Sequence, residues 1–178
     1  ELATGIATSK VSGPGYNGEK IVVDALTDFS YGVGAADDMS LRKALALADI
    51  LPGENTVEFA PSLFASGAQT LTLQDKSGGS VYQGALVLGS LVTLVGPGAD
   101  LLSISGNDQS RVLHTKSTAV ATVRDLSIVH GRVTGGNRGA GILNDGNLTL
   151  DSDSLENNVA LNYGGGIYSS TGNLYISN

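Results

Sequence analysis

The chain has 178 residues, a length that suits one domain or a stretch of a longer protein, and its 25 Gly residues indicate many turns. There is no Cys, which excludes disulfides and thiolate metal sites, and the net charge of −7 argues against nucleic acid as a partner. No apolar run approaches the ~18 residues that a membrane span needs, so no span is expected in this chain.

One amphipathic helix is predicted near the N-terminus, at Ser40–Leu51, after a cap strand at Ile21–Leu26. Its apolar residues recur at the three- and four-residue spacing of one helix face: Leu41, Ala44, Leu45 and Ala48. Ser40 is a favourable N-cap, and Pro52-Gly53 ends the helix. Residues 1–55 are therefore predicted to form a cap with a flexible start, and residues 56–178 a second region.

Short strands separated by turns are predicted throughout this second region. The first four are Thr56–Phe59, Gln69–Leu73, Ala85–Leu88 and Val92–Val95. Further along, Ala121–Gly131 aligns with Leu148–Asn158 at an offset of 27 residues, and Gly146–Ser152 aligns with Gly172–Asn178 at an offset of 26. Three short apolar segments in each uneven repeat of about 24–30 residues predict an all-β fold, a right-handed parallel β-helix with three strands per coil.

Equivalent positions of successive coils are expected to stack. Ile104 aligns with Ile128 at an offset of 24, and a further apolar position recurs at Val112, Ile142 and Ile167. Inward side chains of this kind would form apolar columns, and Asn residues at strand ends would hydrogen-bond their copies in the next coil. The single helix would cover the open N-terminal end, which otherwise exposes the core and unpaired strand edges. A β-sandwich with coincidental repeats is the alternative fold.

Several motifs also occur in a characteristic order: SLRKALALAD, NTVEFAPSLF, QTLTL, LVTLVGPGADLLSISGN, RVLHTKS and GGGIY. This order resembles a family of bacterial right-handed β-helix surface proteins, of pectin-lyase-like fold, whose N-terminal module starts with a short Ser-Leu-Arg helix. The later coils are similar to the repeats of chlamydial polymorphic outer-membrane proteins, through Gly165-Gly166-Ile167 and Leu155-Glu156-Asn157-Asn158, with Leu155 where that pattern has Phe. The resemblance implies an exported, extracellular protein at the bacterial cell surface.

The expected function is therefore structural or adhesive, with glycans or other surface proteins as partners through weak multivalent contacts. No catalytic residue and no metal site is assigned, and no cofactor is expected. The chain stops at NLYISN, within a coil, so the last coil is expected to fray or to pair edge to edge with another molecule.

The alternative function is a polysaccharide-active enzyme, a lyase or a glycosidase, because parallel β-helices include pectate lyases and polygalacturonases. Such chemistry needs paired carboxylates, or a base with Ca²⁺, at equivalent positions of adjacent coils. The repeat alignment places Arg124 over Asp151, which indicates a surface ion pair between coils rather than a column of carboxylates. Asp151 and Asp153 would share a strand face and could form a Ca²⁺ site, and Arg132 and Arg138 could hold an acidic sugar.

Overall fold

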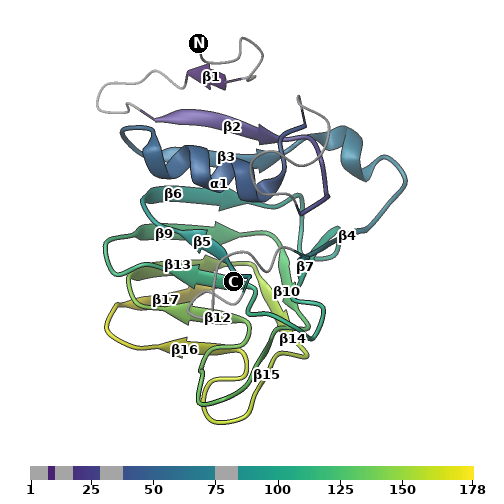
Figure 1. The fold of residues 1–178 in the computed structure, drawn as a ribbon. Coiled ribbons are helices and arrows are strands. Elements are labelled where there is room, and N and C mark those ends of the chain that lie inside the picture. The colour runs from purple at the N-terminus through teal and green to yellow at the C-terminus, as the bar shows by residue number, and fades with distance from the viewer. Residues whose placement is uncertain (1–7, 11–17, 29–37, 75–83) are drawn as a thin grey trace.

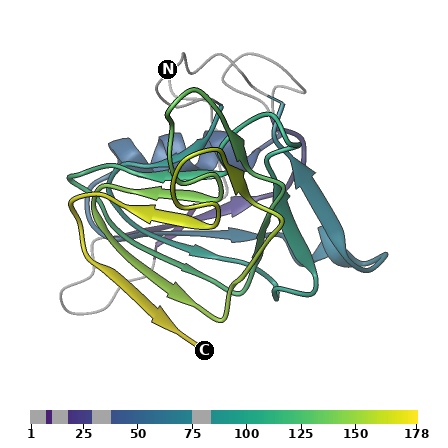
Figure 2. The same cartoon turned by 90° about the horizontal axis from the view of Figure 1, so that it is seen from below.

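The chain folds into a right-handed parallel β-helix, which confirms the predicted fold (Figure 1). The computed structural model describes residues 8–10, 18–28, 38–74 and 84–178. Seen from below, the chain turns counter-clockwise as it comes towards the viewer, which is a right-handed winding (Figure 2). This is the hand that twisted parallel strands favour for the connections between them.

Three parallel sheets form the wall of the β-helix. Sheet 1 contains β1 (Thr8–Lys10), β2 (Glu19–Val23), β3 (Asn55–Phe59), β6 (Leu91–Val95), β9 (Val120–Arg124), β13 (Asn147–Asp151) and β17 (Leu174–Ser177). Sheet 2 contains β4 (Gln69–Thr72), β7 (Leu102–Ser105), β10 (Ser127–Val129) and β14 (Ser154–Glu156). Sheet 3 contains β5 (Leu86–Leu88), β8 (Leu113–Thr115), β12 (Ile142–Asn144) and β16 (Ile167–Ser169). Each coil passes through sheets 1, 2 and 3 in turn, and only the β1–β2 pair is antiparallel among the described strands.

Two short elements are added to this three-sheet plan. A two-stranded parallel sheet 4, made of β11 (Arg132–Val133) and β15 (Val159–Ala160), lies between sheets 2 and 3 in the last two coils. A 3₁₀ helix, η1 (Pro61–Phe64), connects β3 to β4. The repeats did not predict sheet 4, because they contain only three recurring apolar segments per coil.

The first strands of the stack match their predictions closely. The four strands predicted from residue 56 onward are confirmed as β3, β4, β5 and β6, each end within one residue of the prediction. The cap strand, β2, ends at Val23 rather than at Leu26. It ends early because the backbone N–H groups of Asp24 and Ala25 bond to the Met39 carbonyl and turn the chain. The predicted flexible start falls on residues 1–7 and 11–17, outside the described residues, and the division at residue 55 stays a prediction.

The predicted helix is α1, Leu41–Ile50, with Ser40 as its N-cap and Leu51 as its C-cap. The Ser40 hydroxyl accepts a hydrogen bond from the backbone N–H of Lys43, and the four residues of the predicted apolar stripe are all buried. α1 packs against β2, β3, β5 and β6. Because it lies beside β5, the first strand of sheet 3, the helix covers the N-terminal edge of that sheet (Figure 1).

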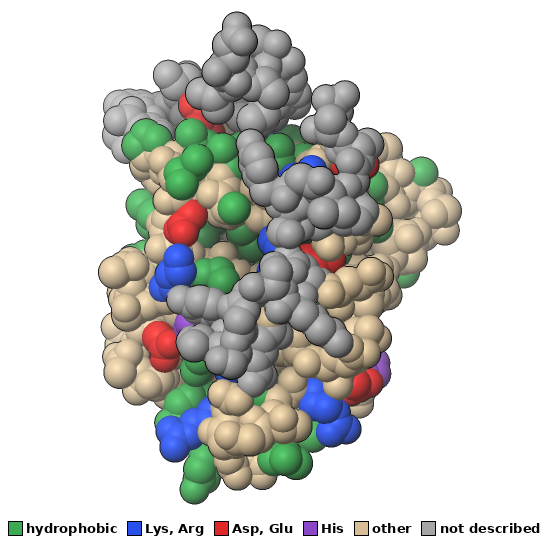
Figure 3. Space-filling view, in the orientation of Figure 1, with side chains coloured by type: hydrophobic (Ala, Val, Ile, Leu, Met, Phe, Trp, Pro, Cys, Tyr) green, Lys and Arg blue, Asp and Glu red, His purple; other side chains and the backbone are tan. Residues whose placement is uncertain are grey.

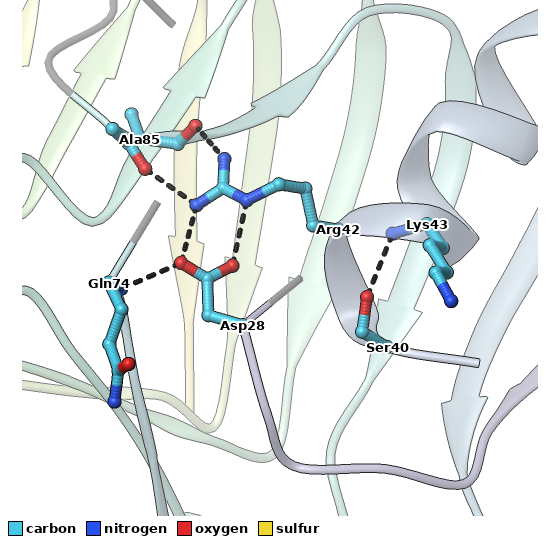
Figure 4. Close-up of polar contacts among 7 residues, drawn as sticks. Asp28, Ser40, Arg42, Lys43, Gln74 and Ala85 are labelled. Carbon is cyan, nitrogen blue, oxygen red and sulfur yellow. Dashed lines mark hydrogen bonds and ion pairs between the residues drawn. The ribbon is translucent and has the colours of Figure 1, made fainter. Parts of the chain in front are cut away.

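Arg42 on α1 forms a buried ion pair with Asp28, and further hydrogen bonds of this pair join the cap to the first coil (Figure 4). Its Nε and Nη2 donate hydrogen bonds to the two oxygens of the Asp28 carboxylate at 2.7 and 3.0 Å. The guanidinium also donates to the backbone carbonyls of Gly84 and Ala85, and the backbone N–H of Gln74 donates to Asp28 at 2.8 Å. The Asp28 side chain has no exposed area, so the pair and its hydrogen bonds connect four chain segments inside the protein.

A second buried polar side chain, Asn55, lies at the start of β3 and ends α1. Its Nδ2 donates to the carbonyls of Ala48 and Leu51 at 3.1 Å and of Gly53 at 3.3 Å, and its Oδ1 accepts from the backbone N–H of Glu19 at 3.0 Å. Carbonyls in the last turn of a helix have no partner within the helix, so Asn55 satisfies groups that would otherwise be buried without hydrogen bonds.

The observed register agrees with the repeat alignment at most positions. The predicted offsets of 27 and 26 residues recur in the pairing of β13 with β9 and with β17. Ile142 pairs with Ile167 as predicted. In the second coil its partner is Leu113, so the prediction of Val112 was wrong by one residue. Val112 and Leu113 are both fully buried, and apolar character therefore could not distinguish them.

The core consists of columns of inward side chains, as predicted. In sheet 1, Val57, Leu94, Val123 and Leu150 stack in register and are buried. The next residue of this column, Ile176 on β17, is 67% exposed because no further coil covers it in the structure. Each inner coil is thus stabilised by apolar contacts on both sides, whereas the last coil has them on one side only.

Polar residues at the corners also recur from coil to coil. Four of the six left-handed non-glycine residues in the described part of the chain form two columns: Asp125 (φ 60°) with Ser152 (φ 58°), and His130 (φ 51°) with Asn157 (φ 55°). The Asn173 amide donates to the Asn147 side chain of the preceding coil at 2.8 Å, which confirms the predicted bonding between Asn copies. These corners allow the chain to bend sharply while its backbone groups stay paired.

The last coil pairs regularly with the coil before it and is not frayed. On its other side, no described strand pairs with β14, β15, β16 or β17. The large apolar side chains exposed in this region are Val159, Leu161, Tyr163, Tyr175 and Ile176. Edge-to-edge pairing with another molecule stays a prediction.

Candidate functional site

The residues proposed as functional candidates lie in two separate places. The first is the corner between sheets 1 and 2, where Arg124 ends β9 and Asp151 ends β13 in register with it. The Arg124 guanidinium is 3.8 Å from the carboxylate of Asp125, so the predicted ion pair with Asp151 is replaced by one within the turn. Asp151 instead accepts hydrogen bonds from the hydroxyls of Ser152 and Ser177 at 3.3 and 3.1 Å.

Asp153 does not share a strand face with Asp151, which corrects the prediction. It lies beyond the end of β13, and its two carboxylate oxygens accept backbone N–H groups from Leu126 at 3.1 Å and Asp151 at 3.3 Å. The side chain therefore joins the third and fourth coils. Among the described residues, no group of three or more His, Asp or Glu side chains has a geometry suited to a metal ion.

The pKa of Asp153 is raised to about 6, mainly by burial and to a smaller extent by the negative charges of Asp125 and Asp151, while the two backbone N–H groups act in the opposite direction. A carboxyl group that exchanges a proton in this range could act as a general acid. Both of its oxygens are occupied by backbone groups, however, so its arrangement fits a structural role better.

The raised pKa of Asp153 predicts a specific pH dependence of stability. Its native pKa of about 6 lies above the ordinary 3.8, so the protonated form is favoured in the folded state. The stability that this preference gives to the folded state is fully present below pH 3.8 and is lost as the pH rises through 6. Asp153→Asn cannot ionise at this position. Relative to this variant, the free energy of unfolding of the wild type is expected to fall by ~1–2 kcal/mol between pH 4 and 7.5, allowing for solvent screening.

The free energy of unfolding, measured by urea denaturation at both pH values, tests this expectation. Asp108→Asn is the matched control, because it removes one negative charge from a carboxylate that is 56% exposed. If the difference in free energy of unfolding between wild type and Asp153→Asn does not change with pH, the pKa of Asp153 is not raised in the folded state.

The second place is the lobe formed by sheet 4 and the loops that follow β11 and β15, at the lower end of the molecule (Figure 1). Arg132 is exposed on β11 and pairs with Val159 on β15. Arg138 lies in the loop after β11, and its guanidinium carbon is 5.2 Å from the ring centre of Tyr163 and 4.9 Å from that of Tyr168. The structure therefore separates Arg132 and Arg138 from Arg124, Asp151 and Asp153.

Two buried groups in the middle coils were not among the candidates. His114 on β8 lies with its Nε2 at 2.9 Å from the Asp145 carboxylate, and only 8% of its side chain is exposed. Burial lowers the pKa of His114 and outweighs the attraction of Asp145. Burial also lowers the pKa of Arg111, whose guanidinium donates to the carbonyls of Arg138 and Gly139 at 2.9 Å. These pairs connect consecutive coils. Sequence patterns could not predict them, because His114 and Asp145 are 31 positions apart and Arg111 and Gly139 are 28 positions apart.

A groove of about 260 Å³ lies between α1 and sheet 3. It is lined by Arg42, Leu45, Ala46, Asp49, Val87 and Lys116. Its charged residues bind one another or their neighbours: Lys116 pairs with Asp49 at 3.2 Å, and Arg42 pairs with Asp28. Figure 3 shows that charged side chains on this face are dispersed among neutral ones.

No family model matches the chain, and neither a curated protein nor a solved structure is significantly similar to it. No helix in the described part of the chain is long and apolar enough to cross a membrane. The candidate residues thus stand on their geometry alone, with a carboxylate-rich corner at sheets 1 and 2 and a basic, aromatic lobe at sheet 4.

Proposed function

We propose that this chain is a structural and adhesive module of an elongated, exported β-helix protein at the bacterial cell surface. The supporting observation is the outer face of sheet 1, where equivalent residues repeat in register. Because Val57, Leu94, Val123 and Leu150 point inward, the residues before them point outward. They form a column of four threonines: Thr56, Thr93, Thr122 and Thr149.

Such a face suits weak contacts that repeat along a rod. Neighbouring strands of a sheet lie ~4.8 Å apart, so the threonines present hydroxyl and methyl groups at regular intervals. Each contact would be weak, and many together give useful avidity. The extracellular location and the cell-surface role rest on the motif order, which resembles that of bacterial β-helix surface proteins of pectin-lyase-like fold. Glycans and other surface proteins are the proposed partners.

A polysaccharide-active enzyme is the second candidate, and the raised pKa of Asp153 is the observation in its favour. A proton donor beside further carboxylates is an arrangement that glycosidases use, and Ca²⁺ bound near Asp151 would serve a lyase. The hydrogen bonds from Leu126 and Asp151 hold the Asp153 carboxylate in the coil corner. That geometry favours the adhesive function over catalysis.

Binding to a glycan array, combined with turnover assays on uronic-acid polymers with and without Ca²⁺, tests the proposal. We expect retention on a subset of glycans and no release of product. Product release that is abolished by Arg124→Ala or Asp151→Asn would replace the proposal by the enzymatic function. Failure to bind any glycan would overturn adhesion through glycans.

A further inference from the structure

Arg138, Tyr163 and Tyr168 form a compact cluster on the lobe, contributed by two successive coils. The Arg138 guanidinium lies over both aromatic rings, at 5.2 Å from the centre of Tyr163 and 4.9 Å from that of Tyr168, and it donates a hydrogen bond to the Tyr168 hydroxyl. Tyr163 is 62% exposed and Arg138 is also exposed, so the cluster is open to solvent. Contact with the aromatic faces restricts the conformations of a long side chain that would otherwise be flexible.

The backbone beneath this cluster is held from inside the protein. Arg111 is only 2% exposed. Its guanidinium donates hydrogen bonds of 2.9 Å to the backbone carbonyls of Arg138 and Gly139. The N–H of Gly139 in turn donates to the carbonyl of Tyr163 at 3.2 Å, which joins the two loops. Gly139 has φ 65°, and a Cβ there would lie 2.3 Å from the Ile142 carbonyl oxygen, so only glycine fits. The cluster is therefore preorganised, which lowers the entropic cost of binding.

The charge of the lobe differs from that of the rest of the protein. Residues 131–144 contain two arginines and no acidic residue, and residues 157–178 contain no charged residue at all. The whole chain has a net charge of −7. A small basic surface on an acidic protein favours a ligand with isolated negative charges, because a densely charged polyanion would be repelled by the remainder of the molecule.

The geometry points to a binding site for a saccharide that carries a carboxylate, formed by Arg138, Tyr163 and Tyr168. The apolar face of a sugar ring would pack on the exposed face of Tyr163. Nε and Nη2 of Arg138 form no hydrogen bond within the described residues, and they can donate together to a carboxylate. This inference names a ligand class for the adhesive role proposed above and rests on that proposal.

Titration of the full chain with an oligosaccharide that carries a single hexuronic acid tests the site, with a neutral oligosaccharide of the same length as the comparison. The chain has six Tyr and no Trp, so tyrosine fluorescence reports directly on the aromatic residues. We expect binding of the acidic ligand that weakens with added salt, and weaker binding of the neutral one. Arg138→Met and Tyr163→Ala are each expected to lower the affinity about tenfold or more, because a charge-assisted hydrogen bond or a stacking face is lost.

Matched controls come from the same types of residue elsewhere on the surface. Lys20→Met removes a basic side chain that is 35% exposed on β2 of sheet 1, and Tyr175→Ala removes a tyrosine that is 61% exposed on β17. Both are expected to bind like the wild type, and circular dichroism verifies that every variant is folded. Equal affinities of Arg138→Met and wild type, or equal binding of the acidic and neutral ligands, would overturn the site. In that case, retention of other glycans on the array leaves the adhesive function standing, whereas failure to bind any glycan overturns both the site and adhesion through glycans.

Discussion

Asp28→Ala is expected to lower the free energy of unfolding by ~3–5 kcal/mol, the range for breaking a buried ion pair by removing one partner. The variant leaves the Arg42 guanidinium, whose side chain is 18% exposed, without its carboxylate. It also removes the acceptor of the Gln74 backbone N–H. Urea denaturation followed by circular dichroism measures the loss. Asp28→Asn retains an acceptor of the same shape, so it is expected to lose less than Asp28→Ala.

The control for this prediction is Glu58→Ala, which breaks an ion pair with Lys20 between neighbouring strands of sheet 1. The side chains of Lys20 and Glu58 are 35% and 32% exposed. Pairs of this kind contribute ~0–1 kcal/mol. Similar losses in Asp28→Ala and Glu58→Ala would mean that the buried pair does not hold the cap on the first coil.

Asn55→Ala is expected to cost ~2–4 kcal/mol, because it leaves several buried backbone groups without partners at ~1–3 kcal/mol each. The carbonyls of Ala48 and Leu51 lose a donor, and the N–H of Glu19 loses an acceptor. The helix C-terminus and the start of β2 are therefore both weakened. Thermal and urea denaturation give the change in stability, and proteolysis within α1 reports on local opening.

Asn147→Ala is the matched control for Asn55→Ala. Asn147 is exposed at the start of β13, and its side chain bonds only to the Asn173 amide within the described residues. Water can replace that bond, so a loss below ~1 kcal/mol is expected. If Asn147→Ala were as destabilising as Asn55→Ala, the effect would come from a general property of Asn in these strands and not from the helix end.

The parts of the fold that could be predicted are those in which residues of one type recur at the helical period or at equivalent positions of successive repeats. The buried stripe of α1 follows from the helical period, and the pairing of Thr122 with Thr149 follows from a repeat of 27 residues. The error at Val112 shows the limit of this reasoning. Two neighbouring residues are both buried there, because the chain turns into β8 at that point, and the apolar pattern no longer alternates.

The candidate site was less predictable than the fold. Arg124 was placed over Asp151 correctly, but the left-handed backbone of Asp125 directs the turn so that the ion pair forms within it. Arg138 was a candidate, but its two tyrosine neighbours were not, because Tyr168 lies 30 residues away in the next coil. The loops after β11 and β15 have no repeat in the earlier coils from which their contact could be inferred.

The sequence by itself therefore determined the class of fold, the helix and most of the strand register, since burial of a periodic apolar pattern depends only on local spacing and on the repeat. The tertiary structure alone decided the partners of the polar side chains. Arg42 meets Asp28 and the carbonyl of Ala85, residues that lie 14 and 43 positions away. Such contacts depend on where turns of unequal length bring the chain, and a repeating pattern contains no information on that point.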